Sequence, residues 1–186
     1  TQYYRESFNK KKKTMQFEES LDKEFLEKIP LSKDMKRFQV ACNLQVPTQL
    51  DEIIKNNGEG IGLLRSEFIY MDRKNAPTED IQFEIYKDIA AQMKAKPVII
   101  RTLDVGGDKE ISYLNIPKEE NPFLGLRATR YCLKEKKLFK IQLRAILRAS
   151  NFGKVKIMFP MISSLKEIRE AKNLLEECKK ELDYEK

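Results

Sequence analysis

The sequence of 186 residues contains no histidine. Histidine is the usual general acid or base near neutral pH, and it is a common nucleophile and metal ligand. Its absence excludes a histidine general base, a histidine nucleophile and a histidine metal site from this chain.

Cysteine is also scarce, with three widely spaced residues, Cys42, Cys132 and Cys178. An odd number at such spacing argues against a disulfide framework and against a zinc site. We interpret all three as buried packing thiols of a cytoplasmic protein. No apolar run reaches membrane length and no signal peptide is recognisable, so no membrane partner is expected.

The net charge of +7 comes from basic residues that are interleaved with acidic ones almost everywhere. Only Lys10 to Lys13 forms a purely basic run, and no aromatic residues are interleaved with it. A nucleic-acid module is therefore the least favoured interpretation. Most of the charge fits solvated helix faces, and binding of a small anion is its second use.

Short apolar strands alternate with amphipathic helices along most of the chain. The expected strands are 38–46, 60–70, 98–100 and 155–162, and the expected helices are 49–56, 81–93, 123–150 in two pieces broken near Lys136, and a last one capped by Ser163 and Ser164. This order predicts right-handed parallel βαβ units and an α/β fold. Residues 1–36 precede them as an expected helical connector to the domain at 37–186.

Four such units are too few for a closed eight-stranded barrel, which typically needs about 250 residues. They fit either a small open sheet or half of a barrel, whose first and fourth strands would need partners. The chain begins at Thr1 rather than at a methionine and ends within a charged helical pattern, so we expect it to be a piece of a longer protein.

Arg65 and Arg101 occupy equivalent places, where two successive apolar strands become polar. Neighbouring strands lie about 4.8 Å apart, so two guanidinium groups there can converge on one anion. With Glu67, Asp104 and Asp108 nearby, the pattern favours a phosphorylated ligand, with or without a metal. The alternative is that both arginines pair with these acids in a structural network.

The loop that follows, Gly106-Gly107-Asp108-Lys109, lacks the spacing of a P-loop, although its glycines allow close approach of a ligand. Asp104 and Asp108 are possible magnesium ligands, but aspartates that form turns are more frequent. Arg127 at a helix start either reaches the same cleft or is solvated.

Met158, Phe159 and Met161 belong to the last expected strand, and we interpret them as core residues and not as contacts to a cofactor.

Several longer motifs resemble those of phosphoenolpyruvate-utilising enzymes and, among these, Enzyme I of the bacterial phosphoenolpyruvate:sugar phosphotransferase system. They begin with GEGIGLLRSEFIYMDR, and the similarity extends from about Phe38 to the end of the chain. The motifs lie at 58–73, 77–83, 100–110, 121–128, 142–150 and 157–162.

The resemblance implies the first half of a phosphoenolpyruvate-binding (β/α)8 TIM-type barrel. The family moves a phosphoryl group from phosphoenolpyruvate to a histidine on a separate N-terminal domain and onward to a histidine-containing phosphocarrier protein. It needs Mg2+ and works as a homodimer. By resemblance Arg65 and Arg101 bind the substrate, and Arg127 lies near the same cleft.

The same resemblance places the magnesium-binding acids, a later substrate arginine and the catalytic cysteine of the family beyond Lys186. We therefore expect no catalytic residue and no metal ligand in this chain, and no activity from it alone. The alternatives are a non-catalytic half-barrel that binds or assembles, and a piece of a related phosphoenolpyruvate synthase or dikinase.

Overall fold

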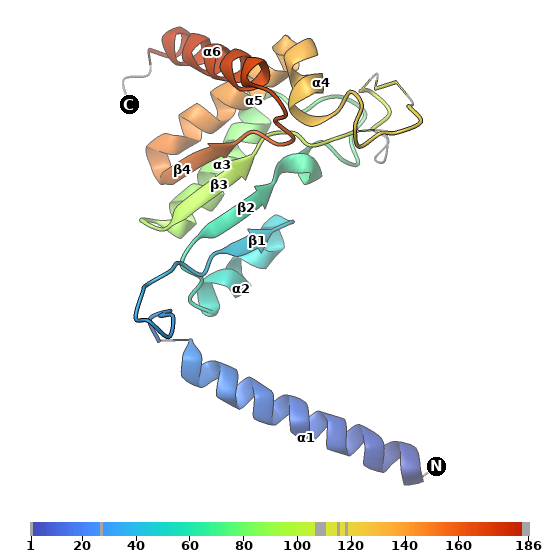
Figure 1. Ribbon diagram of the computed structural model, residues 1–186, viewed down its shortest axis with the longest axis vertical. Helices are drawn as coiled ribbons and strands as arrows, with labels where there is room; N and C mark the ends of the chain where they lie inside the picture. Colours follow the sequence, from blue (N-terminus) through green and yellow to red (C-terminus); the bar gives the residue numbers. More distant parts are fainter. Residues whose placement is uncertain (1, 27, 107–110, 115, 118, 184–186) are drawn as a thin grey trace.

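The computed structural model describes residues 2–26, 28–106, 111–114, 116–117 and 119–183. These residues form one sheet of four parallel strands in the order β1-β2-β3-β4 (Figure 1). The strands are β1 (Cys42–Leu44), β2 (Ile61–Arg65), β3 (Pro97–Arg101) and β4 (Lys154–Met158). The predicted α/β fold with parallel units is confirmed, and it is consistent with part of a TIM-type barrel.

Helices follow each strand, as the sequence predicts. The α-helices are α2 (Leu50–Lys55), α3 (Glu79–Met93), α4 (Ala128–Lys134), α5 (Lys136–Ala149) and α6 (Leu165–Glu181). Three short 3-10 helices are η1 (Pro47–Gln49), η2 (Ser66–Ile69) and η3 (Ser150–Phe152). Thr78 caps α3 by accepting a hydrogen bond from the backbone of Ile81, and Ser164 forms a capping box with Glu167 at the start of α6. The predicted break between the two helical pieces falls at Glu135.

Three strands are shorter than the sequence predicts. The first is confined to Cys42–Leu44, and the second ends at Arg65, where the chain turns into η2. The fourth ends at Met158, because Pro160 has no N–H group with which to extend the ladder. Met161 then has a positive φ of 58° and is exposed, so its prediction as a core residue is wrong.

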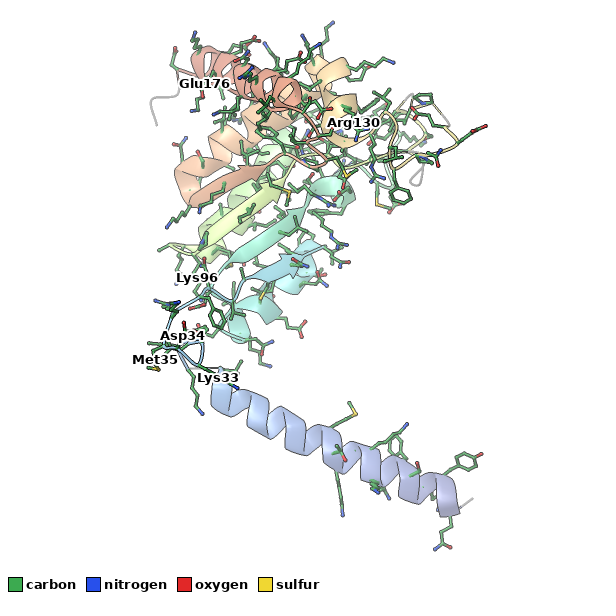
Figure 2. All side chains as sticks on the ribbon, viewed as in Figure 1. Lys33, Asp34, Met35, Lys96, Arg130 and Glu176 are labelled. Carbon is green, nitrogen blue, oxygen red and sulfur yellow. The ribbon has the colours of Figure 1, made fainter. Side chains whose placement is uncertain are left out.

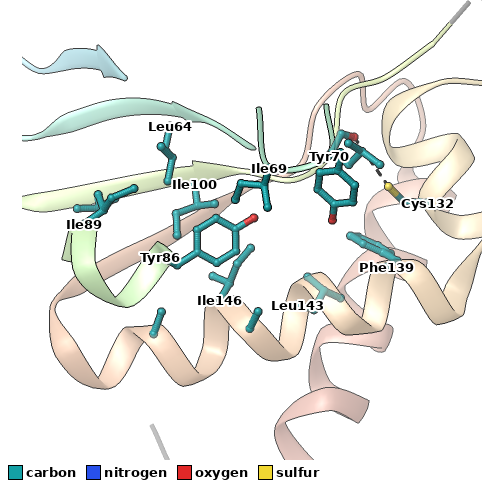
Figure 3. Close-up of a cluster of buried hydrophobic side chains, with 14 of the residues drawn as sticks. Leu64, Ile69, Tyr70, Tyr86, Ile89, Ile100, Cys132, Phe139, Leu143 and Ile146 are labelled. Atoms are coloured by element: carbon teal, nitrogen blue, oxygen red, sulfur yellow. Dashed lines mark hydrogen bonds between the residues drawn. The ribbon is translucent and has the colours of Figure 1, made fainter. Parts of the chain in front are cut away.

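The core lies between the sheet and the helices α3 and α5, which pack against it and against each other. Figure 3 shows Leu64 and Ile100 from the strands facing Tyr86, Leu143 and Ile146 from the helices, and all five side chains are fully buried or nearly so. Burying one aliphatic side chain of this size contributes about 1.5–3 kcal/mol. This layer packs β2 and β3 against the helices and so positions the residues at the ends of these strands.

The opposite face of the sheet has less cover among the described residues. Leu63 and Ile99 on that face are half-buried, and Lys154 and Lys156 of β4 are exposed. β1 and β4 pair on one side only within the described part of the chain. Parallel sheets normally have both faces covered and both edges paired or protected. The less covered face and the two unpaired edges of the described sheet are therefore what we expect of a segment of a barrel.

The N-terminal residues form one helix, α1 (Gln2–Phe25), where the sequence allowed one helix or two. It lies apart from the sheet in Figure 1. The bend that follows contains Lys33, Asp34 and Met35, labelled in Figure 2, and is closed by a bridge between Leu31 and Arg37. In the part of the chain that the structure describes, no helix is both long and apolar enough to span a bilayer.

Candidate functional site

Arg65 and Arg101 are the last residues of β2 and β3 and are direct partners in the parallel ladder. Because the strands are parallel, both side chains start from the same edge of the sheet, about 4.8 Å apart. The structure therefore brings the two arginines together, as the sequence predicts.

Two buried carboxylates hold Arg101. Its Nη2 donates to Oε1 of Glu67 in a short contact, and its Nη1 lies 3.1 Å from Oδ2 of Asp104. Glu67 is 3% exposed and Asp104 is 9% exposed. Arg101 thus pairs with two of the acids that the sequence places near it. Arg65 takes part in none of these ion pairs.

Arg127 belongs to the same cluster. Its Nη2 lies 3.0 Å from Oδ1 of Asp104, and its guanidinium carbon lies 5.1 Å from the centre of the Phe123 ring. Only 6% of Arg127 is exposed, so the interpretation as a solvated arginine is wrong. Sequence reasoning missed its burial because Asp104 and Gly106, which lie against it, come from an earlier segment of the chain.

Gly106 has a specific steric role beside Arg127. A Cβ atom added to this glycine would lie 2.7 Å from Cβ of Arg127 and 3.3 Å from its Cδ and Nε. The missing side chain therefore makes room for the arginine, where the sequence suggested room for a ligand. The rest of that loop, with Gly107, Asp108 and Lys109, lies outside the described residues.

Some buried polar atoms in this region have no hydrogen-bond partner. Among the described side chains they are Nε of Arg65, Nε of Arg101, Oε2 of Glu67 and Nε of Arg130. Arg130, labelled in Figure 2, lies near the start of α4, which follows the loop from the end of β3. Unpaired buried polar groups are rare in native proteins and often mark functional sites. Their concentration where β2 and β3 end points to a ligand there.

The charges of the cluster favour an anion. Arg101 and Arg127 pair with the carboxylates of Glu67 and Asp104, and Arg65 is the ladder partner of Arg101. The described residues thus carry one excess positive charge in a largely buried setting. Arginine binds phosphate and carboxylate through two parallel hydrogen bonds, so this setting suits a small phosphorylated acid.

The described residues do not fit a magnesium ion. No group of three or more histidine, cysteine, aspartate or glutamate side chains among them is arranged to hold a metal. Both oxygens of Asp104 and one of Glu67 are occupied by arginines.

None of the three cysteines belongs to the ion-pair cluster, although Sγ of Cys132 lies 3.8 Å from the carbonyl oxygen of Leu103, the residue before Asp104. Cys132 and Cys178 are fully buried, as predicted, whereas Cys42 is only half-buried, so its predicted burial is wrong in part. Burial, with a contribution from Asp104, raises the pKa of the Cys132 thiol to about 12. A thiol of such high pKa is a poor nucleophile.

Most of the chain is similar in sequence to known proteins. Residues 19–186 match the family described as PEP-utilising enzyme, PEP-binding domain. The chain belongs to this family. It is 51% identical over 152 residues to the phosphoenolpyruvate-protein phosphotransferase of Bacillus subtilis (strain 168), covering 82% of this chain and 27% of that protein. It is 50% identical over 168 residues to the protein of the same name from Staphylococcus carnosus (strain TM300), covering 88% of this chain and 29% of that protein. The chain thus spans less than a third of the length of these relatives.

Proposed function

We propose that this chain supplies part of the phosphoenolpyruvate site of a phosphoenolpyruvate-protein phosphotransferase, with Arg65 and Arg101 as substrate-binding residues. The observation that carries the proposal is the pair of arginines at one register position of β2 and β3, each with a buried Nε that lacks a partner. Membership in the PEP-binding family and the names of the relatives support it.

The role of these arginines follows from the chemistry of phosphoryl transfer. The reaction requires positioning of the phosphoryl group and stabilisation of its charge more than proton transfer. Arg65 and Arg101 would bind and orient the anion, while Glu67 and Asp104 hold Arg101 in place before the anion arrives. The chain contains no histidine, so the acceptor histidine that we propose belongs to another part of the protein.

Further parts of the proposal depend on the family. We place the Mg2+ ligands and the catalytic residues outside the acids described here. A histidine-containing phosphocarrier protein would take the phosphoryl group onward, and the whole enzyme would be a cytoplasmic homodimer that serves sugar transport. The free thiols of Cys42, Cys132 and Cys178 support a reducing compartment. Neither nucleic acid nor membrane is proposed as a partner.

A chimaera tests the proposal. This chain replaces the matching segment of the Bacillus subtilis relative, and phosphoryl transfer from phosphoenolpyruvate to protein is measured. Arg65→Lys and Arg101→Lys each retain the charge but lose the planar fork, so we expect the KM for phosphoenolpyruvate to rise about 10–100-fold. An unchanged KM in either variant would remove that arginine from the site.

The matched control is Arg148→Lys. Arg148 also pairs with carboxylates, those of Glu79 and Asp80, but it does so on the outer helices. We expect its KM to stay within about twofold of the parent, because these ion pairs join α3 to α5 and involve neither Arg65 nor Arg101.

Calorimetry on the chain alone gives a second test. Phosphoenolpyruvate should produce little or no heat, since the remaining part of the proposed site is supplied by other residues. Tight binding by the chain alone would contradict this division of the site.

A further inference from the structure

Gln142 on α5 is a buried amide on an otherwise apolar helix face, with 1% of its surface exposed. Its Nε2 donates to the hydroxyl oxygens of Ser66 and Tyr86, each at 3.0 Å. Its Oε1 accepts from the backbone N–H of Leu103 at 2.9 Å. Both amide hydrogens and one acceptor position are therefore used, as burial of such a group requires.

Two of these contacts fall on the segments that carry the candidate site. Ser66 directly follows Arg65, and Leu103 comes two residues after Arg101. The ladder between β2 and β3 ends at the Arg65–Arg101 pair. Immediately beyond this pair, the side chain of Gln142 joins the two segments, in addition to the ion pair between Arg101 and Glu67.

The far side of the amide is fixed by α3. The Tyr86 hydroxyl, which accepts from Gln142, donates to Oε1 of Gln82 at 3.5 Å, and the Tyr70 hydroxyl donates to the same oxygen at 3.0 Å. Nε2 of Gln82 donates to the carbonyl of Pro77 at 3.2 Å. Burial raises the pKa of both tyrosines, so both hydroxyls remain protonated donors.

We propose that Gln142 is a positioning residue for the phosphoenolpyruvate site, which holds the ends of β2 and β3 so that Arg65 and Arg101 face one anion. The inference rests on the proposed function above. Hydrogen bonds that fix a binding side chain act through small displacements, and a shift of about 1 Å can cost about 100-fold in rate.

The test is Gln142→Met in the chimaera. Methionine nearly preserves the volume of glutamine but can make none of the three strong hydrogen bonds. We expect kcat/KM for phosphoenolpyruvate to fall about 10–100-fold, mainly through KM, because the arginines lose their common orientation.

Gln82→Met is the matched control. Gln82 is also 1% exposed and belongs to the same network, but its hydrogen bonds go to Tyr70, Tyr86 and Pro77, and not to Ser66 or Leu103. We expect a similar loss of thermal stability with a KM change of less than about threefold. If both variants lose activity only in proportion to stability, Gln142 is merely structural.

Ser66→Ala keeps the inference falsifiable if Gln142→Met does not fold. It removes one hydroxyl and one contact with Gln142, so we expect a rise in KM of about threefold to tenfold. A parental KM in Ser66→Ala or in folded Gln142→Met overturns the inference, provided that Arg65→Lys weakens binding. Should Arg65→Lys and Arg101→Lys both keep the parental KM, the proposed function itself fails.

Discussion

Asp104 is the residue on which the ion pairs of the candidate site converge. Its Oδ2 lies 3.1 Å from Arg101, and its Oδ1 lies 3.0 Å and 3.3 Å from two nitrogens of Arg127. Asp104→Asn keeps the shape of the side chain but removes its charge. It also replaces one oxygen by an NH2 group, which must face one of the two arginines.

The expected loss of stability follows from this burial. Breaking a buried ion pair by removing one partner costs about 3–5 kcal/mol, because the remaining charge stays buried without compensation. Arg127, with 6% of its surface exposed, cannot turn into water without leaving its packing on Phe123. With a urea m-value of about 2.5 kcal/mol per M, the unfolding midpoint should fall by about 1–2 M.

Equilibrium urea unfolding of the chain, followed by circular dichroism, measures this loss. Asp80→Asn is the matched control, since Asp80 also pairs with an arginine, Arg148, but its side chain is 81% exposed. Its loss should be below about 1 kcal/mol. If the two variants lose the same free energy of unfolding, or if Asp104→Asn loses less than about 1 kcal/mol, burial does not strengthen the ion pairs of Asp104.

Other changes test the packing around the site. Gly106→Ala forces a Cβ to within 2.7 Å of Arg127, so urea unfolding should show a loss of about 1–3 kcal/mol; an unchanged midpoint would mean that the loop yields freely. In the native chain a thiol reagent at pH 8 should label Cys42 quickly and Cys132 only after unfolding, and equal rates would contradict their difference in burial. The pKa of Cys132 is raised to about 12 from its ordinary 9.0, so the protonated thiol stabilises the fold fully below pH 9 and less as the pH rises toward 12. Urea midpoints between pH 8 and 10.5 should therefore fall less steeply in Cys132→Ala.

The arrangement of the sheet could be predicted from local patterns. The change from a period of two to a period of 3.6 marks each strand and helix, and Thr78 and Ser164 mark helix starts because their hydroxyl oxygens cap backbone N–H groups. The parallel order then places Arg65 beside Arg101. These inferences depend only on residues that are close in sequence and on the handedness of βαβ units.

The ends of the strands and the partners of the arginines could not be predicted in this way. Where a ladder stops depends on the neighbouring strand, so apolar Phe68 and Ile69 continue the pattern of a strand although they lie in η2. The burial of Arg127 requires Asp104 and a glycine from an earlier segment. In the sequence, Gln142 can be noticed only as a single amide among the apolar residues of its helix, and its hydrogen-bond partners are seen only in the fold.

The contrast between satisfied and unsatisfied buried groups supports a ligand at the ends of the strands. Deep in the core, Gln142 donates both of its amide hydrogens, and Nε2 of Gln82 donates to the carbonyl of Pro77. By contrast, Nε of Arg65 and Nε of Arg101 have no partner. Leaving such a group unpaired costs about 1–3 kcal/mol. The fold provides hydrogen-bond acceptors for these buried amide groups, namely the hydroxyl oxygens of Ser66 and Tyr86 and the carbonyl of Pro77. The N–H group at Nε of each arginine is unsatisfied where the two strands end. An anion that pairs with these two groups would recover that loss, and this gain would add to the attraction of the excess positive charge.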